Sequence, residues 1–304
     1  MYKNQRVLVT GGTGFLGKAI VSYLRQQAVE VIALSSQDAD LRERQQSIAV
    51  LQQYSPQIVI HCAVQGGGIG WMKQHPVDSG LDNYRINANV MEASFLAKAK
   101  SFIGVSSACA YPRSCPVPFR EEDLWNGFPE PTNAGYALSK RMMMELGRSY
   151  FLQYGFHTAF PVLANLYGPG DHLQPARAHV VADLMIRCAK RPAELSLWGS
   201  GKPSREFLYI DDAVSGVLAC LQAKPASIIN IGTGIETPII ELAEQVLEAH
   251  KLTIPIRLDP ERPDGQPRKV LCVQRAKQQL GWMAKVSLTE GLQRTASWYV
   301  KHIG

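Results

Sequence analysis

The chain has 304 residues, and 32 Lys and Arg against 26 Asp and Glu give a formal net charge of +6. Hydrophobic residues at 46% and charged residues at 19% are typical of a globular protein and exclude a disordered, fibrous or repeat chain. No uncharged apolar run reaches the ~18 residues of a membrane span, and the six cysteines lack the paired spacing of a metal site or disulfide framework.

Short β-branched runs alternate with helical stretches through the first part of the chain. Strands are predicted at 6–10, 29–34, 57–61 and 102–106, with helices near 15–27, 47–53 and 83–98 between them. Parallel strands need crossover connections, which cover both faces of their sheet. This order predicts an α/β fold built on a doubly wound parallel sheet of the Rossmann type.

The second part of the chain is less regular. A helix is predicted at 136–154 and a strand at 157–163, with breaks in regular structure at 168–171 and in the Pro-rich segment 257–267. The last helix is predicted to begin at Ser287, because Glu290 three residues later completes a capping-box pattern.

A glycine-rich loop, Gly11–Gly17 (GGTGFLG), joins the first strand to the first helix. Gly11 permits the tight turn, Gly14 lets the backbone approach a pyrophosphate, and Gly17 allows the helix to pack closely on the strand. The N–H groups and positive dipole end of the helix favour phosphate at this place. The loop therefore predicts a dinucleotide-binding site.

Two domains are expected from this reading. The dinucleotide-binding Rossmann domain is predicted to cover 1–167 and 205–233. A smaller C-terminal α+β domain that binds the substrate is predicted to cover 168–204 and 234–304. The chain would then cross between the domains more than once.

Serines stand at the end of the second strand, where NAD-binding proteins usually carry Asp or Glu on the ribose hydroxyls. The hydroxyls of Ser35 and Ser36 can donate hydrogen bonds to a 2′-phosphate without repelling it. NADPH/NADP+ is therefore the predicted cofactor, and an NAD enzyme with an atypical loop is the alternative.

Tyr136 and Lys140 lie four residues apart, on one face of a predicted helix. An ammonium near a phenol favours the phenolate and lowers its pKa, so such a tyrosine can give a proton to a carbonyl oxygen while hydride reaches the carbon. Ser107 follows the fourth strand, at the sheet edge where ligands gather, and could bind the same oxygen.

The glycine loop, the serine and the Tyr-x-x-x-Lys pattern together resemble the extended short-chain dehydrogenase/reductase family. The resemblance is nearest to its members that convert GDP-4-keto-6-deoxy-D-mannose to GDP-L-fucose by 3,5-epimerisation and 4-keto reduction. It extends nearly end to end, through the segments Ser35–Leu41, Ser107–Pro112, Asn165–Pro169, Ala178–Val180, Trp198–Gly201, Arg205–Phe207 and Asp264–Lys269.

The resemblance implies roles for particular residues. Cys109 matches the family's epimerisation base and His179 its acid, and both residue types can exchange protons near neutral pH. Reduction would then use the Ser107, Tyr136 and Lys140 group. The cofactor would be held by Gly11, Gly14, Phe15, Leu16, Gly17, Ser35, Ser36, Asp40, Leu41, Ala63, Tyr136, Lys140 and His179, and the nucleotide sugar by Asn165, Arg187, Trp198, Arg205 and Lys269.

Other interpretations of these residues stay open. A free cysteine such as Cys109 is often a small buried hydrophobe, His179 could be a surface or capping residue, and Trp198 could belong to the core. The chain also departs from the family pattern near the expected meeting point of nicotinamide and sugar, at Gln65-Gly66, Ala108 and Leu163-Ala164. These departures bear on the identity of the sugar.

Three functions are therefore weighed: the epimerase/reductase, a nucleotide-sugar 4-ketoreductase or 4-epimerase acting on another sugar, and a non-catalytic NADP-binding sensor. No metal, nucleic acid or membrane partner is expected.

The N-terminal MYKNQRVLVTGG shows no leader pattern, so a cytoplasmic protein is expected. The resemblance implies a homodimer, for which Met142–Met144 could supply a contact, although core packing would explain this run equally well.

Overall fold

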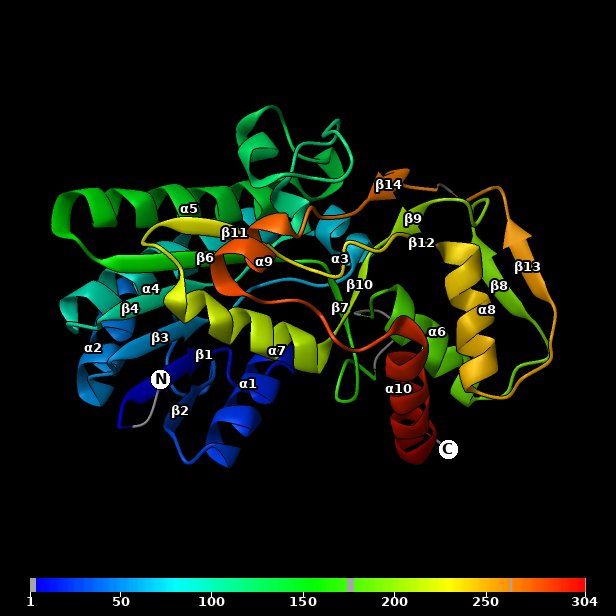
Figure 1. Cartoon of the computed structure of the whole chain (residues 1–304), viewed down its shortest axis with the longest axis horizontal. Helices are drawn as coiled ribbons and strands as arrows, with labels where there is room; N and C mark the ends of the chain where they lie inside the picture. The colour runs from blue at the N-terminus through cyan, green and yellow to red at the C-terminus, as the bar shows by residue number, and fades with distance from the viewer. Residues whose placement is uncertain (1–3, 174–177, 263, 304) are drawn as a thin grey trace.

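The computed structural model describes residues 4–173, 178–262 and 264–303. Figure 1 shows a larger lobe, in which helices cover a central sheet, and a smaller lobe of helices and short strands beside it. Among the described residues, none of the helices combines the length and the apolar character that a membrane crossing requires.

The central sheet is entirely parallel, with the order β11-β6-β4-β3-β1-β2 and a short β5 that also pairs with β6. Its strands are β1 (Arg6–Thr10), β2 (Glu30–Leu34), β3 (Ile58–His61), β4 (Ser101–Gly104), β5 (Ser106–Ser107), β6 (His157–Leu163) and β11 (Ser227–Ile231). The chain leaves β1 first toward β2 and then returns to β3 on the other side. Sheets of this order bind ligands beside the carboxyl ends of the strands at which the order reverses, which here are β1 and β3.

Helices cover both faces of the sheet, which is why strands such as β3 are buried along their whole length. One face carries α1 and α7, which contact each other, and the other carries α2, α4 and α5 in a row (Figure 1). These helices are α1 (Phe15–Gln26), α2 (Arg44–Tyr54), α4 (Asn83–Leu96), α5 (Ala134–Tyr154) and α7 (Ile210–Ala219).

The smaller lobe is built from pairs of short strands and three mutually packed helices. Its strand pairs are β7 (Asn165–Tyr167) with β10 (Phe207–Tyr209), β8 (Leu195–Trp198) with β13 (Ile256–Asp259), and β9 (Ser204–Arg205) with both β12 (Thr237–Pro238) and β14 (Arg268–Lys269). Its helices are α6 (Val180–Ala189), α8 (Ile239–Ala249) and α10 (Leu288–Ile303).

The structure confirms the predicted fold class and the order of its first elements. The capping prediction is also confirmed, because the Ser287 hydroxyl accepts the Glu290 N–H at 3.2 Å and α10 begins at the next residue. The expected break at 257–267 is wrong at its start, where pairing with β8 extends the chain as β13, and Pro263 lies outside the described residues. Five α-helices of the described structure were not predicted: α3 (Ile69–Gln74), α6, α7, α8 and α9 (Gln274–Leu280).

The structure also bears on the predicted role of the methionine run and on the predicted division into domains. Met143 and Met144 are buried within the single chain, so core packing explains most of the methionine run. The segment after residue 233 also contacts the larger lobe, because α9 packs on β11 and the Trp282 indole donates to the Ser215 hydroxyl of α7 at 2.9 Å. The division into two domains stays a prediction.

Candidate active site

The glycine loop has the shape that a bound pyrophosphate needs. Gly11 has a φ of +63°, and a Cβ at Gly17 would overlap the Gly11 oxygen, so the helix can lie this close only with glycine. Gly14 is the N-cap of α1 and supplies no side-chain cap. The N–H groups of the first turn, at Phe15 and Leu16, are therefore left for an anion.

The ends of β2 and β3 border this loop. The Gly12 N–H donates to the Leu34 oxygen at 2.9 Å, and a Cβ at Gly11 would lie 2.9 Å from the Ala63 nitrogen. Ala63 is therefore next to the loop, as expected of a cofactor-binding residue. These contacts fit a dinucleotide laid across the carboxyl ends of β1, β2 and β3.

The structure differs from the expected role of the two serines after β2. The Ser35 hydroxyl donates to the Asp38 carboxylate at 2.7 Å. Because a hydroxyl has one proton, Ser35 is not free to donate to a 2′-phosphate in this arrangement. Ser36 is exposed, Leu41 is buried, and the Asp40 carboxylate is held by Arg42.

Ser107 and Tyr136 meet at the carboxyl end of the sheet. Ser107 ends β5, its hydroxyl accepts the Cys109 N–H at 3.2 Å, and a hydrogen bond between Ser107 and Tyr136 lowers the pKa of the phenol. Burial nevertheless dominates and raises the pKa of Tyr136 well above its usual value. The phenol is therefore protonated at neutral pH, as a proton donor must be.

Lys140 lies next to the Tyr136 ring, as the four-residue spacing predicts, but burial outweighs any effect of its charge on the phenol and leaves the pKa of Tyr136 raised. The Lys140 Nζ lies 5.8 Å from the centre of the Tyr136 ring and donates to the Val105 oxygen at 2.9 Å. Burial lowers the pKa of Lys140 to about 8. The Lys140 ammonium is thus held beneath the tyrosine by the backbone that follows β4, and its charge is lost just above neutrality.

Cys109 lies beside the same group, with a cation against its sulfur. The Lys269 Nζ is 3.7 Å from the Cys109 Sγ. Burial opposes ionisation of the thiol, but the Lys269 charge and hydrogen bonds from Ser107, Lys269 and Asn133 outweigh it, so the pKa of Cys109 is lowered. Burial alone raises the pKa of Cys220 to about 12, which shows how strongly the surroundings favour the Cys109 thiolate.

Strand pairing and hydrogen bonds to the backbone hold Lys269 and Arg205, which belong to the smaller lobe, near Cys109. They pair across β9 and β14, and the Arg205 Nη1 donates to the Gln266 oxygen at 2.7 Å. The neighbouring Glu206 is buried, and its carboxylate accepts the Gly234 and Leu271 N–H groups, each at 2.7 Å. The same residue's carbonyl oxygen accepts the Asn165 amide at 2.9 Å.

Three of the expected site residues have no direct bond to Cys109 among the described residues. No hydrogen bond or ion pair within the described residues joins His179, Arg187 or Trp198 to it. His179 occupies the N-cap position of α6 without a side-chain capping hydrogen bond. Desolvation lowers the pKa of its imidazole, although the residue is exposed and the charge of Asp171 opposes the effect.

Arg187 and Trp198 make other contacts in the smaller lobe. The Arg187 guanidinium pairs with Asp183 at 2.8 Å and donates to the Ser196 oxygen at 2.6 Å. The Trp198 ring is 64% exposed with the Arg262 guanidinium 5.1 Å from its centre, so Trp198 is not a core residue.

Comparison with known proteins identifies the family. The family described as "NAD dependent epimerase/dehydratase family" matches residues 7–232. The chain belongs to this family. GDP-L-fucose synthase from Sinorhizobium fredii is 35% identical to it, over 98% of this chain and 96% of that protein.

Solved structures of the epimerase/dehydratase family agree. The GDP-L-fucose synthetase from Naegleria fowleri bound to NADP is 28% identical with a TM-score of 0.88, over 98% of this chain and 95% of that chain. The GDP-mannoheptose C4 reductase from Campylobacter jejuni, also with NADP bound, is 26% identical with a TM-score of 0.88, over 98% of this chain and 99% of that chain. These likenesses confirm the fold class and the resemblance inferred from sequence.

Sequence reasoning within this family missed several residues around the site. Asn133 precedes α5 and hydrogen-bonds Cys109, and the charge of Asp171 acts to raise the pKa of His179. Glu206 fixes the segment that carries Lys269. Only Glu206 carried a sequence signal, because it lies in the Arg205–Phe207 segment. Asp38 lies in the segment Ser35–Leu41, which resembles the family. An acidic residue was considered only at the positions of Ser35 and Ser36, so Asp38 was passed over.

Proposed function

We propose that the chain is an NADPH-dependent epimerase/reductase that converts GDP-4-keto-6-deoxy-D-mannose, or a close nucleotide-sugar analogue, to GDP-L-fucose or its counterpart. The full-length similarity to GDP-L-fucose synthases supports this substrate class. The contact of Lys269 with Cys109 carries the proposal, because it adds an ionisable thiol to a Ser107–Tyr136 reductase site. A plain ketoreductase needs no such base.

The cofactor would lie across the glycine loop, with its pyrophosphate at the N–H groups of Phe15 and Leu16. The residues proposed to hold it are those named from the sequence, with His179 and Ala63 toward the nicotinamide. NADPH, when bound, supplies the hydride that reduces the C4 ketone. The residues of this chain supply the protons and hold the sugar.

Epimerisation begins at Cys109. The C4 ketone acidifies the hydrogens on C3 and C5, so the Cys109 thiolate can take one and leave an enolate. His179 returns a proton to the opposite face of the same carbon, and the two residues then exchange protons with water before the second centre reacts. Lys269 keeps the thiolate available at neutral pH by opposing its protonation.

Reduction then uses Tyr136. Its raised pKa keeps the phenolic proton in place until the C4 oxygen gains negative charge, when the proton passes to that oxygen. Ser107 donates a second hydrogen bond to the oxygen, and the Lys140 ammonium stabilises the phenolate that remains. One site thus serves both epimerisation and reduction.

The nucleotide sugar is proposed to contact residues of the smaller lobe. Arg205 pairs with Lys269 across β9 and β14 and would meet the sugar or its diphosphate together with Lys269 and Asn165. Arg187 and Trp198 would meet the nucleotide farther out. Guanidinium groups suit a diphosphate because they donate two parallel hydrogen bonds.

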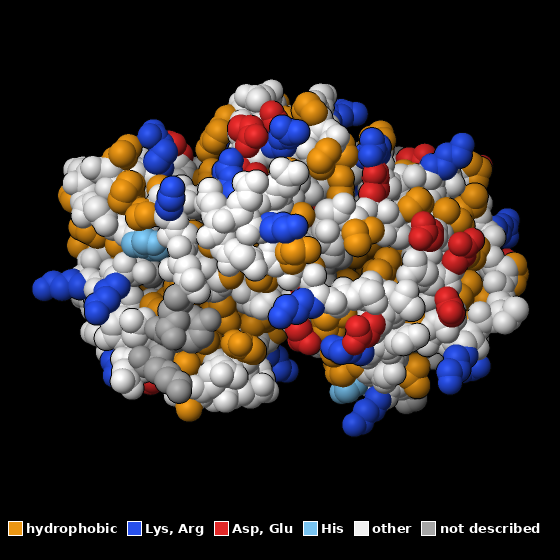
Figure 2. Space-filling model, viewed as in Figure 1, with side chains coloured by type: hydrophobic (Ala, Val, Ile, Leu, Met, Phe, Trp, Pro, Cys, Tyr) orange, Lys and Arg blue, Asp and Glu red, His pale blue; other side chains and the backbone are white. Residues whose placement is uncertain are grey.

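The assembly and compartment are also proposals. We infer a homodimer through α5, on whose outer surface Leu152 and Tyr154 are 66% and 53% exposed. The six free cysteines support a reducing compartment such as the cytoplasm. Figure 2 supports a small-molecule partner rather than a nucleic acid, because Lys and Arg are scattered over the viewed face and form no continuous patch.

The decisive test is incubation with NADPH and GDP-4-keto-6-deoxy-D-mannose in deuterated water. Deuterium at C3 and C5 of the product with stoichiometric NADPH oxidation would support the proposal. A reduced product without deuterium would indicate a plain ketoreductase, and deuterium incorporation without NADPH oxidation would indicate an epimerase without reductase activity. A 4-epimerase would leave this ketone unreduced and would interconvert a 4-hydroxy nucleotide sugar with no net NADPH oxidation. Cofactor binding with no conversion of any nucleotide keto-sugar would indicate a sensor.

A further inference from the structure

A chain of buried hydrogen bonds runs from the central sheet to the helix that carries Tyr136. Thr10 ends β1 and His61 ends β3, and the two residues lie opposite each other in the sheet. The Thr10 Oγ1 is 2.7 Å from the His61 Nδ1, and the His61 Nε2 is 3.0 Å from the Asn87 Oδ1 of α4. The Asn87 amide donates to the Ser139 oxygen of α5 at 3.1 Å. These four residues are fully buried.

The donor and acceptor roles along this chain follow from the chemistry of its groups. The side of the Asn87 amide that meets the Ser139 carbonyl must be the nitrogen, so the amide oxygen faces His61 and can only accept. The His61 Nε2 therefore carries a proton. Burial and the nearby Lys140 charge lower the pKa of His61 to about 3, so the imidazole is neutral and its Nδ1 accepts from the Thr10 hydroxyl. Every hydrogen bond of the chain then runs in one direction, from β1 to α5.

The two ends of the chain lie at two parts of the candidate site. At one end, the Thr10 Oγ1 accepts the Ala63 N–H at 3.2 Å, and a Cβ at Gly11 would lie 2.9 Å from the Ala63 nitrogen. At the other end, Ser139 follows Tyr136 by three residues, and its hydroxyl donates to the Tyr136 oxygen at 2.7 Å. The chain therefore connects the glycine loop to the helical turn that holds the proton donor.

The backbone of His61 makes a second connection to the same helix. Its carbonyl oxygen accepts the Val105 N–H at 3.0 Å, and the Val105 oxygen accepts the Lys140 ammonium at 2.9 Å. The route through Asn87 and this backbone route end at neighbouring residues, Ser139 and Lys140. The place of His61 in the sheet therefore bears on both the ammonium and the turn that precedes it.

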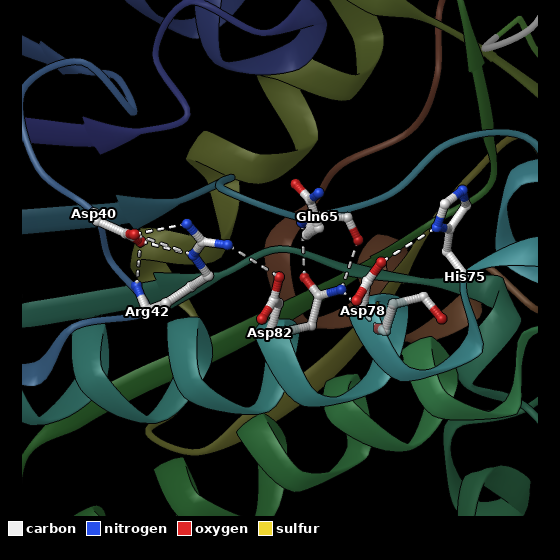
Figure 3. A network of polar contacts seen from close by, with 8 residues as sticks. Asp40, Arg42, Gln65, His75, Asp78 and Asp82 are labelled. Carbon is white, nitrogen blue, oxygen red and sulfur yellow. Dashed lines mark hydrogen bonds and ion pairs between the residues drawn. The ribbon is translucent and has the colours of Figure 1, made fainter.

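Other polar contacts of the α4 region do not reach α5. Asp82, just before α4, pairs with Arg42 of the loop after β2 at 3.4 Å (Figure 3). Ser94 is buried within α4, and its hydroxyl donates to the Val90 oxygen of the same helix at 2.6 Å. Asn87 differs from both residues, because its amide connects α4 to α5.

We propose that His61 is a positioning residue for the reduction, which holds the Tyr136 turn of α5 in place relative to the bound dinucleotide. The inference rests on the hydride-transfer part of the proposed function. Because His61 is fully buried, it acts through Asn87 rather than by contact with the sugar. An imidazole suits this place because it accepts at one nitrogen and donates at the other without adding a charge beside Lys140. The phenol and the hydride must reach one carbonyl group, so a small displacement of α5 slows reduction and leaves cofactor binding intact.

The test compares four variants in single-turnover hydride transfer to GDP-4-keto-6-deoxy-D-mannose. The dissociation constant of NADPH and the deuterium exchange at C3 and C5 are measured alongside. His61→Leu removes both hydrogen bonds of the imidazole, and Asn87→Leu removes the last link to α5. His61→Gln keeps an uncharged side chain that can both accept and donate. Ser94→Ala is the matched control, because it removes a buried hydrogen bond that stays inside α4.

Hydride transfer is expected to fall about tenfold or more in His61→Leu and in Asn87→Leu, with the NADPH dissociation constant and the deuterium exchange unchanged. His61→Gln is expected to recover part of the rate, and Ser94→Ala to keep the wild-type rate. A double variant that combines His61→Leu with Asn87→Leu should lose no more than the larger single loss, because both changes break one chain.

The wild-type rate of hydride transfer in folded His61→Leu or Asn87→Leu would overturn the inference. An equal loss of hydride transfer, exchange and cofactor binding would also overturn it, because such a loss indicates a purely structural role. If His61→Leu does not fold, Asn87→Leu decides by the same criteria. A wild-type protein that binds NADPH and transfers no hydride to the keto-sugar would overturn the proposed function itself.

Discussion

The ammonium of Lys269 lies 3.7 Å from the sulfur of Cys109, although 160 residues separate the two in the chain. Cys109 follows the central sheet of the larger lobe, and Lys269 belongs to a two-residue strand of the smaller lobe. The reactive thiol is therefore ionisable only where the two lobes meet. The first two predictions follow from this contact.

Replacing Lys269 by Met should raise the pKa of Cys109, because the positive charge that favours the thiolate is lost. Less thiolate then forms at pH 7, and hydrogen exchange at C3 and C5 should slow about tenfold and recover at higher pH. The pH dependence of alkylation by iodoacetamide measures the pKa directly. Lys277→Met, an exposed lysine on α9, is the control, and an unchanged alkylation profile in Lys269→Met would contradict the prediction.

Cys109→Ser should separate the two halves of the reaction. A serine hydroxyl is far less acidic than the thiol, so deuterium incorporation at C3 and C5 should fall at least about 100-fold. NADPH oxidation by the unepimerised ketone should fall less, since Tyr136 and Ser107 remain. Mass spectrometry of the product and absorbance at the reduced nicotinamide band measure the two rates, with Cys272→Ser as the control. A greater loss of hydride transfer than of exchange would refute the role assigned to Cys109.

The hydride-transfer rate should fall as the pH rises through about 8. Burial lowers the pKa of Lys140 to about 8, so the ammonium is present below that pH and lost above it. Tyr136 keeps its proton throughout this range because its pKa is raised. The Lys140→Arg variant keeps its charge and should move the fall to higher pH, and single-turnover rates across pH 6 to 10 would reveal it. Identical profiles in both proteins would assign the pH dependence to another group.

Glu206→Ala should destabilise the protein by about 3 kcal/mol or more, because it leaves several buried N–H groups without acceptors. The carboxylate accepts from Thr233, Gly234 and Leu271 inside the protein. Urea unfolding measures the change. The control is Glu145→Ala, whose exposed ion pair with Arg148 should contribute far less to stability. Equal losses in the two variants would show that Glu206 is not a structural acceptor.

Gly17→Ala should abolish tight dinucleotide binding, because its Cβ would overlap the Gly11 oxygen and push α1 away from the loop. Gly70→Ala, where a Cβ meets nothing within 4 Å, should bind as the wild type does. Calorimetric titration with NADPH compares them. Wild-type affinity in Gly17→Ala would show that the loop adapts without cost.

The larger lobe was predictable because its signals are local. Buried β-branched strands, a glycine loop and a Tyr-x-x-x-Lys helix each occupy one continuous segment, and a parallel sheet places their carboxyl ends at one edge. The smaller lobe was less predictable because its strands span two to four residues, too few for a period to emerge.

Contacts between distant segments could not be predicted from the residues alone. The Lys269 contact with Cys109 depends on the pairing of β9 with β14, for which no pattern exists in either strand. The reversal at Ser35 has a similar cause. Ser35 was expected to bind a phosphate, but its hydroxyl donates to Asp38, three residues later. Which partner the hydroxyl takes depends on the geometry of the turn, and the sequence does not show that geometry.

The order of the strands also limits how this molecule can be divided. β11 (Ser227–Ile231) forms the outer edge of the central sheet, but the chain reaches it only after passing through α6, β8 and β9 of the other lobe. A fragment that stops before β11 would leave the amide and carbonyl groups along one side of β6 open to pairing with other chains. Truncating the chain where it first enters the smaller lobe would therefore yield a protein that aggregates. Exchanging one lobe between relatives would need cuts at both places where the chain passes from one lobe to the other.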